Sequence, residues 1–307
     1  MNHTLSSHSR LCPEYRLLDS GFRRKLEQVG PVRIIRPALN AFWRPSLPDS
    51  EWKRADATFE RDSRGGGLWT WSGKHSSPPG DWNISWGGVN LLIKPTQFGH
   101  LGFFAEQAEN WAWLRSTIRS MQRKNGKDGG GLLPRTLNLF AYSGGASFAM
   151  AQAGADTCHL DSSKGIIEWA RNNQKLNPET EERIRWICDD AMKFVAREER
   201  RAHKYNGIVL DPPSFGRGLQ GQVWKIEDGL HDILNSCKRI LDTKTPFFLL
   251  LSCHSQGFSP VSLKRCLEEV FPEKDISIEA GEMLIPEKNG KMLPAGLFAR
   301  LTGNLSS

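Results

Sequence analysis

The chain has 307 residues and is 38% hydrophobic, which suits one large α/β domain plus a smaller one and excludes wholesale disorder. Its longest apolar runs, such as residues 247–251, are too short to cross a bilayer, and residues 1–10 lack the apolar segment of a secretory signal. The net charge of +7 and the isoelectric point near 9.1 favour polyanionic partners, but only weakly.

The cysteines carry information about compartment and metal binding. Six of them are spread along the chain, with no C-x-x-C pair. This pattern argues against a disulfide framework and a clustered zinc site, and it favours free thiols in a reducing compartment. We therefore expect a cytoplasmic protein with no metal and no membrane partner, in which most cysteines are buried as small apolar residues.

The N-terminal part of the chain has the composition of a small β-rich domain. We expect a flexible tail at residues 1–14 and short strands with turns at residues 15–94, including a strand at residues 32–37 that Pro37 ends. Its tryptophans favour an aromatic core, allowing for one exposed exception, over a platform on which bases stack. They are Trp52, Trp69, Trp71, Trp82 and Trp86.

Residues 95–307 change to alternating helices and apolar strands. We expect strands at residues 136–140, 155–160, 185–188, 207–210 and 246–252. Helices are expected at residues 104–123, 147–153, 164–176, 191–201, 227–241 and 260–270, followed by a hairpin at residues 276–299. This order, with nearly continuous apolar strands, is typical of a doubly wound parallel sheet in an α/β, Rossmann-like fold.

Ligands of such a sheet bind beyond the carboxyl ends of its strands. After the first strand, Gly144 and Gly145 allow a tight turn and close approach of a ligand to the backbone at a helix N-terminus. The G-x-G-x-x-G fingerprint is not met, which disfavours a nicotinamide enzyme. The second strand ends in Asp161, which can bind ribose hydroxyls or cap the next helix. Its spacing from the glycine turn favours ribose.

The third and fourth strands also end in carboxylates. Asp190 can accept a hydrogen bond from an adenine amine or act as a helix N-cap. The fourth strand ends in Asp211-Pro212-Pro213-Ser214-Phe215, the strongest motif of the chain. Its prolines fix the backbone and donate no amide hydrogen, so carbonyls can point into a cleft, while Phe215 offers a ring on which a base could stack.

These motifs together resemble those of a known enzyme family. Residues 137–147, Asp161, residues 168–171, Asp190 and residues 211–215 look like those of class I S-adenosylmethionine (SAM)-dependent methyltransferases related to the bacterial large-subunit ribosomal RNA methyltransferases of the 5-methylcytosine type. The resemblance covers about residues 95–260, and residues 98–107 resemble the family's element that reaches over the donor. Relatives often carry an N-terminal RNA-binding module of the PUA type, which we expect this chain to lack.

The resemblance implies SAM as the cofactor. It places Gly144 near the methionine part of the donor, Asp161 at the ribose and Asp190 at the adenine. Asp211 would lie near the sulfonium and the acceptor. The donor site implied in this way also includes Phe140, Tyr142, Ser143, Ser162 and Asp211, and the catalytic residues would be Asp211, Pro212 and Phe215.

Cys253 is a separate candidate because it follows another apolar strand near the expected cleft. Related 5-methylcytosine enzymes use a cysteine thiolate here, which adds to carbon 6 of cytosine and so activates carbon 5. His254 would point to the opposite face of the strand. A buried strand-end cysteine is slightly favoured over a nucleophile, and the motif at Asp211 also suits methylation of a nitrogen by alignment alone.

The predicted function is methyl transfer from SAM to a base of structured RNA, with ribosomal RNA as the first candidate. An oxidoreductase on a similar sheet is disfavoured by the glycine pattern. Alternatives that stay open are nitrogen methylation of another RNA, a protein or a small molecule, and a non-catalytic SAM-binding RNA assembly factor. The sequence does not specify the oligomeric state.

Overall fold

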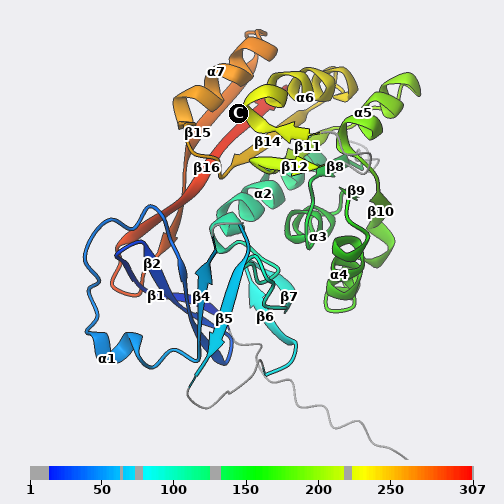
Figure 1. Ribbon diagram of the computed structural model, residues 1–307. Coiled ribbons are helices and arrows are strands. Elements are labelled where there is room, and N and C mark those ends of the chain that lie inside the picture. The colour runs from blue at the N-terminus through cyan, green and yellow to red at the C-terminus, as the bar shows by residue number, and fades with distance from the viewer. Residues whose placement is uncertain (1–13, 63–64, 73–78, 125–132, 218–222, 306–307) are drawn as a thin grey trace, which may run out of the picture.

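The computed structural model describes residues 14–62, 65–72, 79–124, 133–217 and 223–305, which form a small β-rich part and a larger α/β part (Figure 1). The N-terminal sheet has the strand order β1-β2-β3-β4-β5 and is antiparallel except between β3 and β4. Its strands are β1 (Tyr15–Gly21), β2 (Arg24–Val29), β3 (Val32–Pro37), β4 (Ala57–Arg61) and β5 (Gly67–Trp71). A short helix precedes β4 and an antiparallel hairpin follows the sheet: α1 (Asp49–Trp52), β6 (Trp82–Trp86) and β7 (Val89–Ile93).

The five tryptophans of this part form core, as predicted. Trp52 is buried beneath the outer face of the sheet, and the other four are partly buried against the apolar cluster that joins the sheet to the rest of the molecule. Some of the indole N–H groups also donate hydrogen bonds to backbone carbonyls. Trp82 donates to the Val29 carbonyl at 3.0 Å, and Trp86 donates to the Ala105 carbonyl at 2.9 Å. These side chains are therefore not a free stacking platform.

The α/β part contains a seven-stranded sheet of order β10-β9-β8-β11-β14-β16-β15. Its strands are β8 (Arg135–Leu139), β9 (Asp156–Asp161), β10 (Ile184–Cys188), β11 (Gly207–Leu210), β14 (Phe247–Cys253), β15 (Ile276–Pro286) and β16 (Met292–Gly303). The first five in spatial order are parallel, but β16 is antiparallel to both β14 and β15. The parallel strands and the C-terminal hairpin are both as predicted, and the hairpin joins the same sheet antiparallel to β14 because its short turn allows only antiparallel strands.

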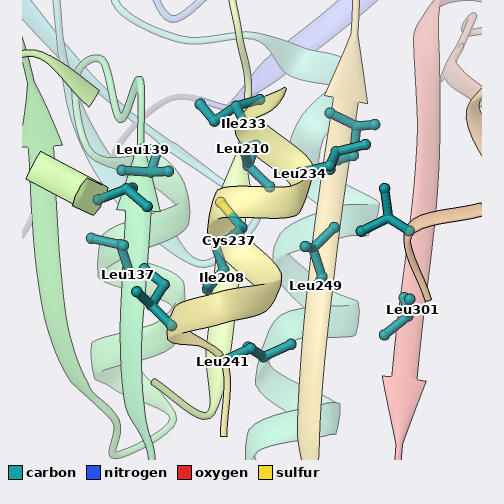
Figure 2. Packing of buried hydrophobic residues seen from close by; sticks show 14 of the residues in the cluster. Leu137, Leu139, Ile208, Leu210, Ile233, Leu234, Cys237, Leu241, Leu249 and Leu301 are labelled. Carbon is teal, nitrogen blue, oxygen red and sulfur yellow. The ribbon is translucent and has the colours of Figure 1, made fainter. Parts of the chain in front are cut away.

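Helices cover both faces of this sheet. They are α2 (Ala108–Lys124), α3 (Gly145–Gln152), α4 (Lys164–Gln174), α5 (Ala191–Arg200), α6 (Ile226–Ile240) and α7 (Pro260–Val270), with short 3-10 segments η1 (Ala105–Gln107) and η2 (Pro178–Arg183) and a ribbon of β12 (Phe215–Arg217) and β13 (Val223–Lys225). Figure 2 shows α6 lying on the strands, with Ile233, Leu234 and Cys237 facing Leu210 and Leu249. Within the described ranges, no helix is long and apolar enough to span a membrane.

The C-terminal hairpin connects the two parts of the molecule. Strands β15 and β16 run from the α/β sheet to the N-terminal sheet (Figure 1), where Ile285 and Leu293 enter the apolar cluster built by β1, β3 and β7. The backbone of Glu287 forms a β-bridge with Leu17, and its side chain accepts a hydrogen bond from the Ser20 hydroxyl. The N-terminal sheet therefore shares its core with the end of the chain.

Candidate active site

The parallel strands end level with one another along one edge of the large sheet. Leu139 pairs in register with Leu160 and Leu210, and Leu210 also pairs with Leu251. Because the chain leaves each strand at this edge, the segments that follow are neighbours in space although they are far apart in sequence. The strand ends and the segments after them contain the predicted residues Phe140, Tyr142, Ser143, Gly144, Asp161, Ser162, Asp190, Asp211, Pro212, Phe215 and Cys253.

The loop between β8 and α3 has a strained and tightly held backbone. Phe140 and Tyr142 have φ values of 56° and 49°, and Gly144 follows with a φ of 102°. A non-glycine residue in the left-handed region costs energy and persists only where the surroundings hold it. They do so at Ser143, whose hydroxyl donates to the Gly102 carbonyl and whose carbonyl accepts from Asn173 Nδ2 at 2.9 Å.

Position 145 at the start of α3 requires glycine, because a side chain there would have no space. A Cβ atom there would lie 2.2 Å from Cζ2 of Trp111, so the indole ring of α2 packs directly on the bare backbone. Trp111 and Gly145 both line the cavity at this edge. The second glycine of the predicted turn thus allows a helix and an indole to approach closely beside the cavity.

Asp161 ties the ends of two strands together. One carboxylate oxygen accepts from the Tyr142 amide at 3.1 Å, and the other accepts from the Ser163 amide at 3.0 Å. Burial raises the pKa of Asp161, although these backbone hydrogen bonds oppose the shift. The N-cap of α4 is Ser163 instead, whose hydroxyl accepts from the Ile166 amide. The capping alternative for Asp161 therefore does not hold, and Ser162 beside it is exposed.

Asp190 does cap a helix. Its side chain accepts from the Lys193 amide at 3.0 Å at the start of α5. The neighbouring Asp189 pairs with Arg197 at 2.8 Å and accepts a hydrogen bond from the Asp190 amide at 2.8 Å. The second oxygen of Asp190 is compatible with a ligand, because a carboxylate accepts several hydrogen bonds.

Asp211 has polar partners from two other elements. Its Oδ2 accepts from Gln107 Nε2 at 3.3 Å, and its Oδ1 lies 3.4 Å from His254 Nδ1. Gln107 also donates to the Ser252 hydroxyl at 3.1 Å. These contacts link η1, β11 and β14, so the carboxylate is held from several sides while remaining partly exposed.

An ionic chain runs through this group, from Glu106 to His254 to Asp211. His254 Nε2 lies 3.1 Å from Glu106 Oε1, and the Glu106 side chain is only 6% exposed. Burial acts against the charged imidazole, but the charge of Asp211 and hydrogen bonds with both carboxylates raise the pKa of His254 well above its usual value. Burial likewise acts to raise the pKa of Glu106, and the hydrogen bond and charge of His254 lower it on balance. The His254 imidazole is therefore cationic and lies between the carboxylates of Glu106 and Asp211.

Gln107 is itself oriented by a second chain of hydrogen bonds. Arg300 Nη2 donates to Asn110 Oδ1 at 2.8 Å, and Asn110 Nδ2 donates to Gln107 Oε1 at 2.8 Å. Since an arginine can only donate, it fixes which amide atom of Asn110 faces which partner. The Gln107 amide group must then point its Nε2 at Asp211 and Ser252.

Aromatic rings form much of the wall of the cavity between these groups. Phe104 lies 5.5 Å from both Tyr142 and His254 by ring centroids, and Phe140 lies 5.8 Å from Trp224. The remaining lining comes from the tips of β8, β11 and β14 and from α2 and the segment before it. The site is therefore an aromatic cavity with a few polar groups, the form that small-molecule sites commonly take.

The motif after β11 separates into buried and exposed parts. Pro212 is buried, whereas the Phe215 side chain is 54% exposed. Trp224 donates its indole N–H to the Pro213 carbonyl at 3.0 Å, which uses one of the carbonyl groups expected to face the cleft. Ser214 accepts a hydrogen bond from the Ser255 hydroxyl at 2.6 Å.

Cys253 and His254 point to different sides, as the alternation along a strand predicts. Cys253 is 0% exposed and packs in the cluster of α6, α7 and the large sheet. Burial raises the pKa of its thiol, which disfavours a thiolate. Of the other cysteines in the described residues, Cys158 and Cys237 are buried too, whereas Cys188 is exposed and Cys266 is intermediate.

The sequence analysis found the strand-tip carboxylates but not their partners. Glu106 and Gln107 lie within the segment that resembles the family's donor-covering element, yet no local pattern distinguished them. Asn110 and Arg300 come from α2 and β16, and their hydrogen bond joins residues 190 positions apart. Only His254 had a signal, namely its place directly after the apolar strand.

Comparison with known proteins identifies the family. Residues 113–256 match the S-adenosylmethionine-dependent methyltransferases. A solved SAM-dependent methyltransferase from Agrobacterium tumefaciens is 38% identical, aligns over 94% of this chain and 90% of its own, and has a TM-score of 0.84. The chain belongs to the SAM-dependent methyltransferase family.

Two more distant proteins show how far the likeness extends. The ribosomal RNA large subunit methyltransferase K/L of Vibrio cholerae is 28% identical to this methyltransferase over 157 residues, which are 50% of this chain and 20% of that protein. The chain therefore spans about a fifth of the length of this curated relative. SMU.776, described as a methyltransferase complexed with S-adenosylhomocysteine, shares the fold at 16% identity, a TM-score of 0.72, and coverage of 96% of this chain and 77% of its own.

The residues of this methyltransferase fit the cofactor of its family. SAM presents two ribose hydroxyls, an adenine amine and a positive sulfonium, so its site needs acceptors and negative charge. Asp161, Asp190 and Asp211 supply carboxylates along one sheet edge, and the glycine turn and the aromatic cavity lie between them. The donor set along this edge thus agrees with SAM.

Proposed function

We propose that this enzyme transfers a methyl group from SAM to a nucleobase of structured RNA, with ribosomal RNA as the substrate to test first. The observation that carries the proposal is the Asp211 carboxylate, partly exposed at the sheet edge and held by Gln107 and His254 beside an aromatic cavity. A flat base with an amine fits such a site, because the rings can stack on it and the carboxylate can accept its N–H.

Two further observations support an RNA substrate. The Vibrio cholerae relative is named a ribosomal RNA large subunit methyltransferase. The chain also carries a net charge of +7, which favours binding to a polyanion because cations near phosphates release counterions.

For the donor, we propose the contacts that the resemblance implies. Asp161 would accept the ribose hydroxyls, Asp190 the adenine amine, and Gly144 would adjoin the methionine part. The remaining donor residues proposed are Phe140, Tyr142, Ser143 and Ser162. The level strand ends and the half-buried Asp161 carboxylate, which can accept several hydrogen bonds from hydroxyls, support this arrangement.

For the acceptor, we propose a base nitrogen. The sulfonium supplies an activated methyl group when SAM is bound. The lone pair of the nitrogen would form the new bond to the methyl carbon, the carbon–sulfur bond would break with its electrons going to sulfur, and the N–H proton would pass to the Asp211 carboxylate and from there to solvent. Asp211 would accept that N–H in a hydrogen bond and so orient the lone pair along the line of displacement. The positive His254, 3.4 Å from Asp211 Oδ1, would help hold the carboxylate in this orientation.

The environment of Cys253 is a second reason to propose a nitrogen acceptor over carbon 5 of cytosine. A carbon-5 methylation of cytosine by the thiolate route needs an accessible thiol with a lowered pKa. Cys253 is 0% exposed and its thiol pKa is raised, so it has neither property. We therefore assign Cys253 to the core.

The test is methyl transfer from tritiated SAM to ribosomal RNA of cells that lack the gene, followed by mass spectrometry of the nucleosides. We expect one N-methylated nucleoside to appear, and Asp211→Asn to lower the transfer rate at least about a hundredfold while SAM still binds. Asp275→Asn, on an exposed turn, is the matched control and should behave as wild type. A methylated C5 of cytosine would overturn the nitrogen assignment, and tight RNA binding without any transfer would favour an assembly factor.

A further inference from the structure

Exposed aromatic side chains gather at one end of the N-terminal sheet, away from the tryptophan core. Phe22 in the β1–β2 turn is 57% exposed, and in the loop after β3 Phe42 is 75% and Trp43 37% exposed. The turn and the loop lie side by side, because the Phe22 amide donates to the Trp43 carbonyl at 2.8 Å. With Arg23 and Arg44 they form what we call the aromatic–arginine patch.

The patch has a fixed backbone rather than a loose one. Phe22 and Arg23 have φ values of 49° and 62°, a conformation that costs energy in both residues. The Arg23 amide donates to the Ala41 carbonyl at 2.7 Å, and the Trp43 indole donates to the Ser20 carbonyl at 3.0 Å. These contacts hold Phe22 and Phe42 outward at solvent, where apolar burial gains nothing for the folded chain.

The surroundings of the patch are strongly basic. Arg23, Arg24 and Arg44 are exposed at this end of the sheet, whereas Arg33 lies at the opposite end of β3 and pairs with Glu51 at 3.2 Å. Glu27 is buried and paired with Lys25 at 3.1 Å and with Arg36 at 2.7 Å, so it does not offset the exposed arginines. Arg23 lies over the Phe42 ring at 6.0 Å. Aromatic rings interleaved with arginines are typical of surfaces that bind single-stranded nucleic acid.

The same part of the sheet adjoins the wall of the active site. Arg36 on β3 donates to the Gly99 carbonyl at 2.9 Å. The next residue, His100, lies 5.3 Å by ring centroids from Phe104, which in turn contacts His254. These contacts connect β3 of the N-terminal sheet directly to the wall of the cavity.

We propose that the aromatic–arginine patch binds unpaired nucleotides of the RNA substrate, by stacking bases on Phe22 and Phe42 and by holding phosphates with Arg23 and Arg44. The proposal deepens the proposed function and rests on it for the identity of the substrate. The exposed positive charge of Arg23, Arg24 and Arg44 favours a polyanion over an uncharged protein surface.

The test compares the double variant Phe22→Asn/Phe42→Ala with the matched control Leu68→Ala/Val261→Ala, which removes two equally exposed apolar side chains elsewhere. Asparagine is chosen at position 22 because it tolerates a positive φ. We expect roughly tenfold weaker binding of labelled poly(U) by fluorescence anisotropy. In the methyl-transfer assay, KM for ribosomal RNA should rise while kcat is unchanged, and SAM affinity should stay at the wild-type value. The control should differ from wild type by less than about twofold.

A charge variant tests the phosphate contacts separately. Arg44→Gln should weaken poly(U) binding and reduce the slope of log Kd against log salt by about one, whereas Arg265→Gln on α7 should leave the slope unchanged.

The two proposals can fail independently. If wild-type protein methylates RNA but the double variant binds poly(U) and ribosomal RNA equally well, the patch proposal is wrong and the proposed function stands. If wild-type protein methylates no RNA, the proposed function is wrong, and poly(U) binding that depends on Phe42 would still support the patch. Should the double variant lose SAM binding, the single variant Phe42→Ala, at the most exposed ring, decides the matter by the same measurements.

Discussion

Replacing His254 with glutamine should destabilise the folded protein and change how its stability depends on pH. In the wild-type protein the imidazole lies between Glu106 and Asp211, at 3.1 Å and 3.4 Å. Removing one partner of a buried ion pair costs about 3–5 kcal/mol. The His254 side chain is 30% exposed, so water screens part of this interaction and we expect a loss near the lower end, about 3 kcal/mol.

The pH dependence of folding stability gives a sharper test than the size of the stability loss in His254→Gln. Because the pKa of His254 is raised above 6.5 in the folded protein, the folded state binds one more proton than the unfolded chain between that value and the folded pKa. The stabilisation is complete below pH 6.5 and is lost as the pH rises through the folded pKa. Within this interval wild-type stability should fall by about 1.4 kcal/mol per pH unit, and His254→Gln should abolish the fall.

Urea unfolding of both proteins at several pH values from 6 upward measures this difference. In Glu106→Gln, Asp211 is left as the main charge that raises the His254 pKa, so the fall should still begin near pH 6.5 but end at a lower pH than in the wild type. If His254→Gln keeps the wild-type slope, or costs less than about 0.5 kcal/mol, then the imidazole does not carry the charge inferred for it.

Three other outcomes are expected. Gly145→Ala, whose Cβ would lie 2.2 Å from the Trp111 ring, should cost about 1–3 kcal/mol in urea unfolding, whereas Gly165→Ala, with open space around it, should be neutral or slightly stabilising. Asp161→Asn should weaken SAM binding in calorimetry about tenfold or more, and wild-type affinity should fall as the pH drops through the raised pKa of Asp161. Cys253→Ala should keep single-turnover methyl transfer within about threefold of wild type at a small cost in stability; a hundredfold loss with SAM still bound would restore the thiol as a nucleophile.

Much of the α/β part could be predicted from the sequence. The strand Gly207–Leu210 and the helix Pro260–Val270 have the predicted bounds. The strand is a short apolar run that ends at a proline pair, and the helix has Ser259 as a cap with Pro260 in its first turn, so local chemistry fixes both. The level strand ends also followed, because parallel strands with apolar cores must bring their carboxyl ends to one edge.

The N-terminal sheet was harder because polar residues stand inside it. Asp19 and Glu27 are fully buried. Asp19 accepts from the Leu47 amide at 2.8 Å and from the Trp52 indole at 3.0 Å, contacts that hold the loop after β3. A hydropathy pattern predicts charged residues at the surface and so could not reveal β1 and β2 as core strands. The partners of Asp211 escaped prediction for a related reason, since contacts such as Arg300 with Asn110 arise only from the tertiary fold.

The reach of the C-terminal hairpin has a consequence for synthesis on the ribosome. Ile285 and Leu293 fill the apolar interior beside β1 and β3, and Glu287 accepts a hydrogen bond from the Ser20 hydroxyl. Residues 15–37 emerge from the exit tunnel early, yet their interior is closed only when residues 285–293 have emerged as well. Nascent chains halted before that point should therefore expose β1 to β3 to proteases and chaperones.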